Sequence, residues 1–201
     1  MTILHYIPDI DAASGGTSTY MQVLADALGR VCDLHVVTRK SQGELPLVCC
    51  NVHYLPQRWV ATYRGRTAMA TLIDALKPDV VHLNGCWMPG CAIVEMMAQQ
   101  RHIPTVYTPH GMLEPYIIRC HYWTRKLPAI LLYQRRATRR ASRLIATSEA
   151  ERAHLVALGW NRQISLVPQG IDIRQAAVKS TWKRSNSLLF LGRLHEKEQA
   201  V

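Results

Sequence analysis

A glycine pair near the N-terminus is the first feature that could do chemistry. Asp11 to Ser18 contains Gly15 and Gly16, followed by the hydroxyl residues Thr17 and Ser18. If this small-residue loop leads into a helix, its backbone N–H groups can face an anion and the helix dipole favours binding. The loop lacks a complete GxGxxG pattern and the lysine of a P-loop. A plain glycine turn with a hydroxyl cap is therefore the alternative reading.

Two later segments combine histidine, glycine and other polar residues directly after short apolar runs. His82 is followed by Asn84 and Gly85, and a second segment reads Pro109-His110-Gly111-Met112-Leu113-Glu114. A histidine followed by glycine at a strand end can present its imidazole to a ligand while the glycine leaves the backbone accessible. For His110 a purely structural role is the alternative. We expect His82 to pack or hydrogen-bond within its strand.

The elements that position these residues alternate between strand and helix patterns. Helical spacing with a hydroxyl N-cap and a glycine stop runs from Thr17 or Ser18 to Gly29, and Ser148 with Glu151 predicts a capping box. Such alternation predicts an α/β fold, a Rossmann-like parallel sheet with helices on both faces, with ligands beyond the carboxyl ends of the strands. The predicted strands are Thr2–Ile7, Leu34–Thr38, Leu47–Leu55, Val80–Leu83, Thr105–Thr108, Leu144–Thr147 and Ile164–Val167, and the further helices lie near Arg66–Leu76, Ala92–Arg101, Lys126–Ala141 and Ser148–Leu158.

Composition points to a globular protein of the cytoplasm. The 201 residues are 48% hydrophobic and 19% charged, which is ordinary for a folded domain. The six cysteines are scattered without a CxxC pair, so we expect reduced thiols and neither a zinc site nor a disulfide framework. The N-terminus lacks the pattern of a signal peptide, and no stretch approaches the roughly 18 apolar residues that predict a membrane span.

The C-terminal region predicts a second domain. Ser165 to Asp172 reads as a strand running into a Pro/Gly turn, and Leu188 to Leu194 opens a new apolar strand close to the end of the sequence. An apolar strand without a partner is unstable. We therefore expect one domain at residues 1–172, a linker at 173–186 and the truncated start of a second domain at 187–201.

The ordered set of motifs resembles glycosyltransferase family 4, whose members are retaining enzymes with the GT-B fold. The resemblance covers nearly the whole chain. Within the family, the chain most resembles the enzymes that build capsular, exopolysaccharide or lipopolysaccharide sugars on lipid carriers. This resemblance implies the N-terminal, acceptor-side domain of a GT-B enzyme. The motifs are Gly15-Gly16, Asp79-Val-Val-His82, Thr108-Pro-His110-Gly111-Met-Leu, Ala146-Thr147-Ser148-Glu149-Ala-Glu151, Val167-Pro-Gln-Gly-Ile-Asp172 and Leu-Phe-Leu-Gly192-Arg193-Leu194.

The resemblance also implies roles for individual residues. Sugar transfer from a nucleotide diphosphate sugar depends on stabilising the charge of the leaving diphosphate and on placing the acceptor hydroxyl. The resemblance implies that the nucleotide sugar is the co-substrate and that no metal or other cofactor is needed. The acceptor would be polyprenyl-linked or a saccharide. The implied catalytic residues are His110 and Arg193, where Arg193 holds the leaving diphosphate because a guanidinium suits phosphate; an ordinary surface arginine is the alternative. Donor and phosphate contacts are implied for Gly15, Gly16, Gly111 and Arg193, and the acceptor cleft for Asn84 and Glu114.

Two departures from the family pattern affect these roles. Glu198-Gln199 stands where a Lys-Gly pair normally supplies a second cation, and a carboxylate there would oppose a diphosphate. Gln169 replaces the asparagine of a Pro-Asn-Gly turn. The nucleotide-binding region with its two-glutamate motif is absent, so we expect a truncated chain or one half of a split enzyme, with a separate C-terminal half as its partner.

Most of the excess positive charge lies in one segment. The formal net charge is +10, and eight Lys or Arg residues without any acid occur from Arg119 to Arg143. Basic side chains beside aromatic ones favour a peripheral contact with an anionic membrane, here the inner face of the cytoplasmic membrane. A solvated helix face is the alternative; no nucleic-acid module accompanies the charge, so nucleic acid is not expected. The predicted membrane-surface residues are Arg119, Trp123, Arg125, Lys126, Arg135, Arg136, Arg139 and Arg140.

Two other functions share these features. A non-catalytic Rossmann-like module could bind a lipid carrier, a membrane surface or a partner subunit without transferring a sugar. Nucleotide-sugar epimerases share the two-domain architecture, and fold alone does not distinguish them from transferases.

Overall fold

The computed structural model of the protein describes residues 1–55, 61–170 and 181. The chain divides into two compact units, Met1–Ile171 and Asp172–Val201. The first unit contains every strand and helix described below. The linker at 173–186 and the second-domain strand predicted within 187–201 lie outside the described residues, except for Thr181.

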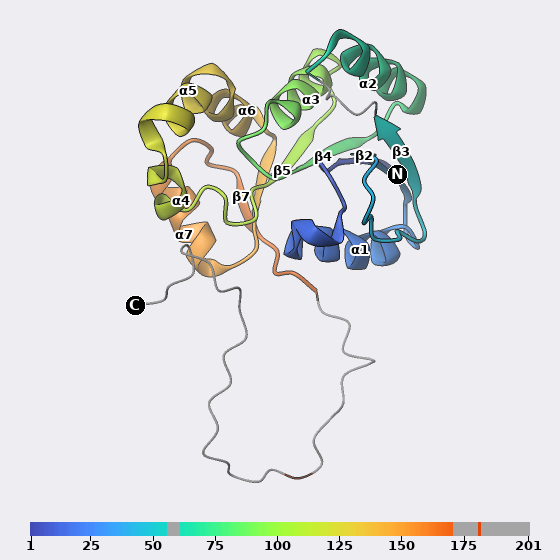
Figure 1. Cartoon of the computed structure of the whole chain (residues 1–201), viewed down its shortest axis with the longest axis horizontal. Helices are drawn as coiled ribbons and strands as arrows, with labels where there is room; N and C mark the ends of the chain where they lie inside the picture. The colour runs from blue at the N-terminus through green and yellow to red at the C-terminus, as the bar shows by residue number, and fades with distance from the viewer. Residues whose placement is uncertain (56–60, 171–180, 182–201) are drawn as a thin grey trace. The chain divides into compact units, whose positions relative to one another are not determined.

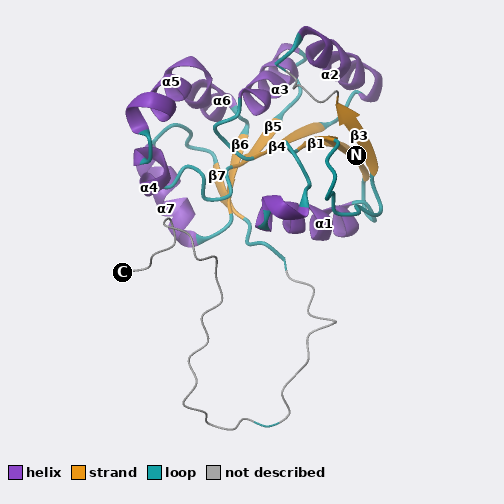
Figure 2. Ribbon diagram, viewed as in Figure 1, coloured by secondary structure: helices purple, strands orange, loops and turns teal. Residues whose placement is uncertain are grey.

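A seven-stranded sheet forms the centre of the first unit (Figures 1 and 2). Every neighbouring pair is parallel, in the order β3-β2-β1-β4-β5-β6-β7. This confirms the predicted Rossmann-like α/β fold. The strands are β1 (Thr2–Tyr6), β2 (Asp33–Arg39), β3 (Asn51–Leu55), β4 (Val80–Asn84), β5 (Thr105–Thr108), β6 (Arg143–Ala146) and β7 (Ile164–Leu166).

Helices cover both faces of the sheet, and each face has its own apolar core. On one face α1 (Gly16–Leu28) packs Met21 and Ala25 against Ile3, Leu34 and Val36 of β1 and β2. On the other face lies the larger core, to which β1, β4, β5 and β6 contribute. The helices that contribute to it are α2 (Tyr63–Leu76), α3 (Pro89–Gln100), α6 (Arg135–Arg140) and α7 (Glu149–Leu158).

Short helical turns complete the unit. A 3-10 turn, η1 (Ala12–Ser14), precedes α1, and α4 (Pro115–Arg119) follows β5. From there the chain reaches α6 through η2 (Tyr122–Lys126), α5 (Leu127–Ala129) and η3 (Ile130–Gln134), of which η2 and η3 are π-helical. The helix predicted near Lys126–Ala141 is therefore present, although its hydrogen-bonding pattern alternates between α and π. Pro128 has no N–H to donate, and in a regular α-helix its ring would clash with the carbonyl four residues earlier.

Two local predictions were wrong. The N-cap of α1 is Gly15, with φ 79° and no side-chain cap, in place of a hydroxyl residue; the predicted stop at Gly29 is confirmed. The strand predicted from Leu47 begins only at Asn51. The chain turns before it, because Cys49 has the left-handed φ of 58°.

Candidate functional site

The strand order reverses between β1 and β4, which pair in the sheet although β2 and β3 lie between them in the sequence. In open parallel sheets ligands bind outside the carboxyl ends of the strands at such a point. A cavity of about 200 Å³ opens there. The loop after β1, the end of β4 and two methionines form its walls: Ile7, Pro8, Asp9, Ser14, Thr17, Asn84, Gly85, Met88 and Met112.

Asn84 joins three elements at this point. Its side chain is almost fully buried at the end of β4. The amide nitrogen Nδ2 lies 3.3 Å from Nδ1 of His5 on β1, and Oδ1 lies 3.1 Å from Nε2 of His110 in the loop after β5. In this orientation Asn84 donates to His5 and accepts from His110. The structure thus brings Asn84 and His110, two of the predicted site residues, into contact.

The backbone at His110 and Gly111 is left-handed, with φ values of 54° and 72°. A side-chain-bearing residue adopts this region only when its surroundings hold it there. The Gly111 N–H donates to Oε1 of Glu151 at 2.7 Å. The His110 ring contacts the Tyr20 ring edge-on, with centroids 4.9 Å apart, and Nδ1 lies 3.4 Å from Nε2 of Gln169. Helices α1 and α7 and the chain after β7 therefore position one imidazole.

Glu151 has a different role from the one predicted. Its N–H donates to Oγ of Ser148 at 3.1 Å, which confirms Ser148 as the N-cap of α7. The carboxylate accepts from Gly111 and, through Oε2, from the backbone N–H and the hydroxyl of Thr147 at 2.8 and 2.7 Å. The returning half of the capping box is therefore directed to Thr147 and Gly111 and away from the Ser148 N–H.

Burial keeps the histidines of this region uncharged. It lowers the pKa of His5 to about 3, with a smaller effect from His110, and lowers the pKa of His110 to about 4 although Glu151 opposes the change. It also holds the pKa of His82 well below its ordinary value. His82 packs on the His5 ring at 4.2 Å and lies 2.6 Å from Oγ1 of Thr108, which confirms its packing role. At neutral pH His110 presents a neutral imidazole, which supplies no positive charge to a diphosphate.

The Gly15-Gly16 loop leaves room for a ligand at the start of α1. The Gly15 N–H donates to the carbonyl of Ala12 at 3.3 Å. A Cβ atom built at Gly16 meets nothing within 4 Å. Thr17, the next residue, lines the cavity beside Asn84. The backbone at Gly16, which carries no side chain, therefore adjoins a residue of the cavity wall.

The other predicted site residues that the structure describes do not line this cavity. Glu114 precedes α4, and its carboxylate contacts Nδ1 of His154 on α7. The N–H of Gly111 already donates to Glu151, so it is not free to donate to a ligand. Arg193 lies outside the described residues.

Comparison with protein families gives a direct match. The model of Glycosyltransferase Family 4 matches residues 14–175, which is most of the chain. The chain belongs to glycosyltransferase family 4. A search of curated proteins finds no match to it.

Solved structures place the family 4 chain with the N-terminal half of GT-B glycosyltransferases. Sucrose-phosphate synthase from Thermosynechococcus elongatus is similar with TM-score 0.63 and 18% identity, over 87% of this chain and 49% of that one. Anabaena HepE in complex with UDP and glucose is similar with TM-score 0.57 and 19% identity, over 86% of this chain and 45% of that one. UDP-GlcNAc 2-epimerase from Methanocaldococcus jannaschii is similar with TM-score 0.56 and 14% identity, over 83% of this chain and 45% of that one. The chain therefore spans about half the length of these structures.

The basic segment of the family 4 domain is largely exposed. The six predicted arginines Arg119, Arg125, Arg135, Arg136, Arg139 and Arg140 are all exposed. Three large apolar side chains of the same segment are also exposed, Trp123 by 78%, Leu131 by 72% and Leu132 by 77%. Lys126 is half-buried, and its ammonium lies 3.8 Å from the centre of the Trp87 ring. No helix among the described residues is long and apolar enough to cross a membrane.

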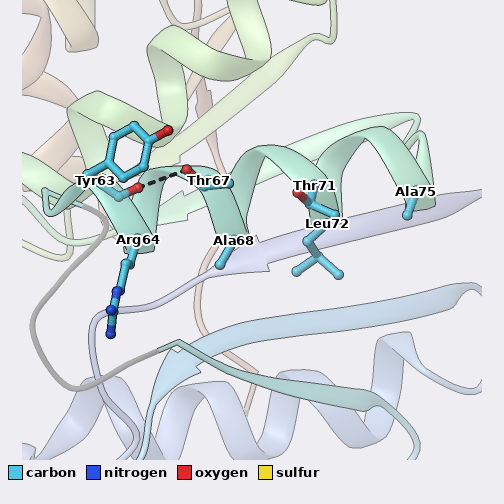
Figure 3. A pocket seen from close by; sticks show the side chains of 7 residues that line it. All are labelled: Tyr63, Arg64, Thr67, Ala68, Thr71, Leu72 and Ala75. Carbon is cyan, nitrogen blue, oxygen red and sulfur yellow. Dashed lines mark hydrogen bonds between the residues drawn. The ribbon is translucent and has the colours of Figure 1, made fainter.

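A hollow of about 550 Å³ along α2 lacks the features of a reaction site (Figure 3). Its lining comes from this one helix, between Tyr63 and Ala75, and is mostly apolar. Thr67 Oγ1 already donates to the Tyr63 carbonyl at 3.0 Å. The polar groups that converge beside Asn84 make the smaller cavity the better candidate.

Sequence reasoning missed two acidic residues of the site. Asp9 lines the cavity; its Oδ1 accepts from the Ser14 hydroxyl and its Oδ2 accepts from Nη2 of Arg39 at 3.0 Å. Its position shortly after the first predicted strand was the available signal. Glu151 was assigned only to its own helix start, because no local pattern pairs a helix residue with Gly111, 40 positions earlier.

Proposed function

We propose that this family 4 domain is the acceptor-side half of an enzyme that transfers a hexosyl group from a nucleotide diphosphate sugar to a hydroxyl of its acceptor, with retention of anomeric configuration. The observation that carries the proposal is the 3.1 Å contact between Asn84 and His110. Asn84 shares its cavity with Thr17, the residue after Gly16, at the point where the strand order reverses. GT-B neighbours that bind UDP and glucose support a nucleotide-sugar donor.

The residues divide the work in this proposal. A neutral His110 contacts the donor sugar, and Asp9 and Asn84 offer hydrogen-bonding groups to its hydroxyls. Gly15 and Gly16 allow the donor to approach the backbone. Arg193 stabilises the negative charge of the leaving diphosphate, so the reaction needs no metal or other cofactor. The reaction joins the acceptor oxygen to the anomeric carbon and releases the nucleoside diphosphate and a proton.

The acceptor is proposed to be a lipid-linked or saccharide intermediate of surface polysaccharide assembly, such as capsule or lipopolysaccharide. Exposed arginines next to Trp123, Leu131 and Leu132 support a lipid-linked acceptor, because basic and interfacial apolar side chains together favour anionic lipid. The enzyme would work in the cytoplasm, peripherally at the inner face of the cytoplasmic membrane. Catalysis by a two-domain cleft also requires a C-terminal half.

A transfer assay tests the proposal. The 201-residue chain is incubated with mixed nucleotide sugars and a membrane fraction holding lipid-linked acceptors, alone and joined to the C-terminal half of a related family 4 enzyme. We expect nucleoside diphosphate release coupled to acceptor glycosylation only in the joined protein, with NMR showing a retained anomeric configuration. A folded joined protein that transfers nothing would favour the binding module, and conversion of the nucleotide sugar without acceptor would favour an epimerase.

A further inference from the structure

A second cavity, of about 270 Å³, lies between α2, α3 and the η3–α6 segment. The three helices α2, α3 and α6 lie on the same side of the sheet (Figure 1). None of the residues that line this cavity lines the cavity beside Asn84. Its lining residues are Arg66, Pro89, Ala92, Ile93, Glu95, Met96, Leu132, Tyr133, Arg136, Ala137 and Arg140.

Three arginines and one buried glutamate line this cavity. Arg66 of α2 and Arg136 and Arg140 of α6 are exposed and carry their charges at its rim. Glu95 of α3 is only 2% exposed, and its Oε1 has no hydrogen-bond partner in the described part of the chain. A buried polar atom without a partner costs free energy. The cavity therefore offers both positive charge and an unused hydrogen-bonding group.

The remaining lining is apolar and reaches the surface. Ile93, Met96 and Leu132 contribute side chains, and Leu132 is 77% exposed. A ligand that matched the whole cavity would have a compact anionic head for the guanidinium groups and an apolar part for this wall. Guanidinium groups match the oxygens of a phosphoryl group in geometry as well as in charge.

We propose that this cavity binds a phosphate monoester with an apolar chain. The guanidinium groups of Arg136 and Arg140 hold the phosphoryl oxygens, with Arg66 on the opposite wall. The carboxyl group of Glu95 donates its O–H to a phosphoryl oxygen, and the apolar chain lies along Met96 and Leu132. The site is independent of the proposed transfer reaction.

The protonation of Glu95 should regulate this site. Burial raises the pKa of Glu95 to about 7, while Arg140 and Arg136 act in the opposite direction. The other titratable or charged groups that line the cavity are Arg66 and Tyr133. Tyr133 donates its hydroxyl to the Trp87 carbonyl at 2.9 Å, and burial raises its pKa. Ionised Glu95 would lose its donor and repel the phosphate, so binding weakens as the pH rises through 7.

Calorimetric titration of the whole 201-residue chain with hexyl phosphate tests the site. We expect saturable binding that Arg136→Met or Arg140→Met weakens about tenfold or more, since each removes charged hydrogen bonds. Arg139→Met is the matched control, because Arg139 lies on the same helix and does not line the cavity. It should change the affinity less than twofold. These arginines are exposed, so the variants retain the fold.

Glu95→Gln tests the buried group directly. Glutamine keeps a donor at every pH, so the variant should bind hexyl phosphate up to about tenfold more tightly than the wild type at pH 8 and equally at pH 6. Hexyl phosphate itself titrates near pH 6, and comparing the two proteins at each pH removes that effect. The absence of saturable binding, equal losses in Arg136→Met and Arg139→Met, or an unchanged affinity ratio would each overturn the proposal.

Vesicles distinguish a lipid headgroup from a soluble ester. Phosphatidic acid carries a phosphate monoester, whereas phosphatidylglycerol is an anionic diester. If the ligand is a lipid, phosphatidylcholine vesicles with phosphatidic acid bind more tightly than those with phosphatidylglycerol, and hexyl phosphate displaces them. If hexyl phosphate binds and the two kinds of vesicle do not differ, the ligand is a soluble ester.

Discussion

The backbone N–H of Gly111 donates to the buried carboxylate of Glu151 at 2.7 Å, which ties the loop after β5 to the start of α7. The same carboxylate holds Thr147 through two hydrogen bonds. One side chain therefore fixes the backbone of two loops, the one that carries His110 after β5 and the one that leads from β6 into α7. This contact makes the site depend on a residue that does not line the cavity.

Glu151→Gln should destabilise the domain by about 1–3 kcal/mol, because an amide nitrogen would face a backbone donor and leave a buried group unpaired. Urea unfolding of the 201-residue chain measures the change. Glu149→Gln is the matched control on the same helix. Glu149 is exposed and forms a 3.4 Å ion pair with Arg152, so its removal should cost less than about 0.5 kcal/mol. Equal effects of the two variants would contradict the role assigned to Glu151.

Acid should destabilise the domain through its buried histidines. Between pH 6.5 and about 4 the unfolded chain binds protons that folded His5 and His110 do not, since their pKa values are lowered to about 3 and about 4. The free energy of unfolding therefore falls with decreasing pH, by up to about 1.4 kcal/mol per pH unit for each histidine. Glu95 opposes this below pH 7, because its pKa is raised to about 7 and its protonation stabilises the folded state.

Urea unfolding at pH 7, 6 and 5 measures the acid effect. His5→Gln should make the loss of stability with falling pH shallower, and Glu95→Gln should make it steeper. A stability that is constant or increases on acidification would show that these histidines become protonated in the folded state.

Gly16→Ala should separate binding from stability. Gly16 is the first residue of α1 and has open space at its Cβ position, so alanine should be neutral or stabilise by up to about 1 kcal/mol. Its methyl group would stand where the donor approaches, and we expect transfer by the joined protein to fall about tenfold. Gly159→Ala is the opposite control, since Gly159 caps α7 with φ 67°; it should cost about 1 kcal/mol and spare transfer. Unaffected transfer in Gly16→Ala would remove Gly16 from the donor site.

Binding to anionic vesicles should depend on the exposed basic segment. Arg135→Gln and Arg139→Gln should each weaken sedimentation with phosphatidylglycerol vesicles about fivefold, from roughly 1 kcal/mol per charge. Arg64→Gln on α2 is the control, since that arginine is exposed on another element. If Arg64→Gln loses as much, the attraction reflects net charge alone.

Much of this architecture could be predicted from the sequence because the strands are short apolar runs that alternate with helical spacing. The runs beginning at Thr2, Val80 and Thr105 all form neighbouring strands, which brings Asn84 and His110 to one edge of the sheet. The carboxyl ends of parallel strands meet there whatever the loops do. The strand order therefore brings these two positions near each other, whereas the conformation of the loop after β5 directs the His110 side chain to Asn84.

The remainder depended on long-range contacts and backbone conformation. Gly15 replaced a hydroxyl N-cap because its positive φ sets the entry into α1. The helical pattern around Pro128 was confirmed, but the chain widens there into π-helical turns because proline has no N–H to donate. Glu151 satisfied the pattern of a local cap, yet its carboxylate accepts a hydrogen bond from Gly111, 40 positions earlier in the sequence. Local spacing carries no information about such partners.

The most direct test is the turnover and melting temperature of His110→Ala in the transfer-competent joined protein. We predict that turnover falls about 100-fold while the melting temperature falls by only about 2–4 °C, the change expected for about 1 kcal/mol. His82→Gln is the control, because His82 is buried against His5 and outside the cavity; it should lose more stability and keep most of its turnover. Unchanged turnover with a lower melting temperature in His110→Ala would make His110 structural and contradict the account.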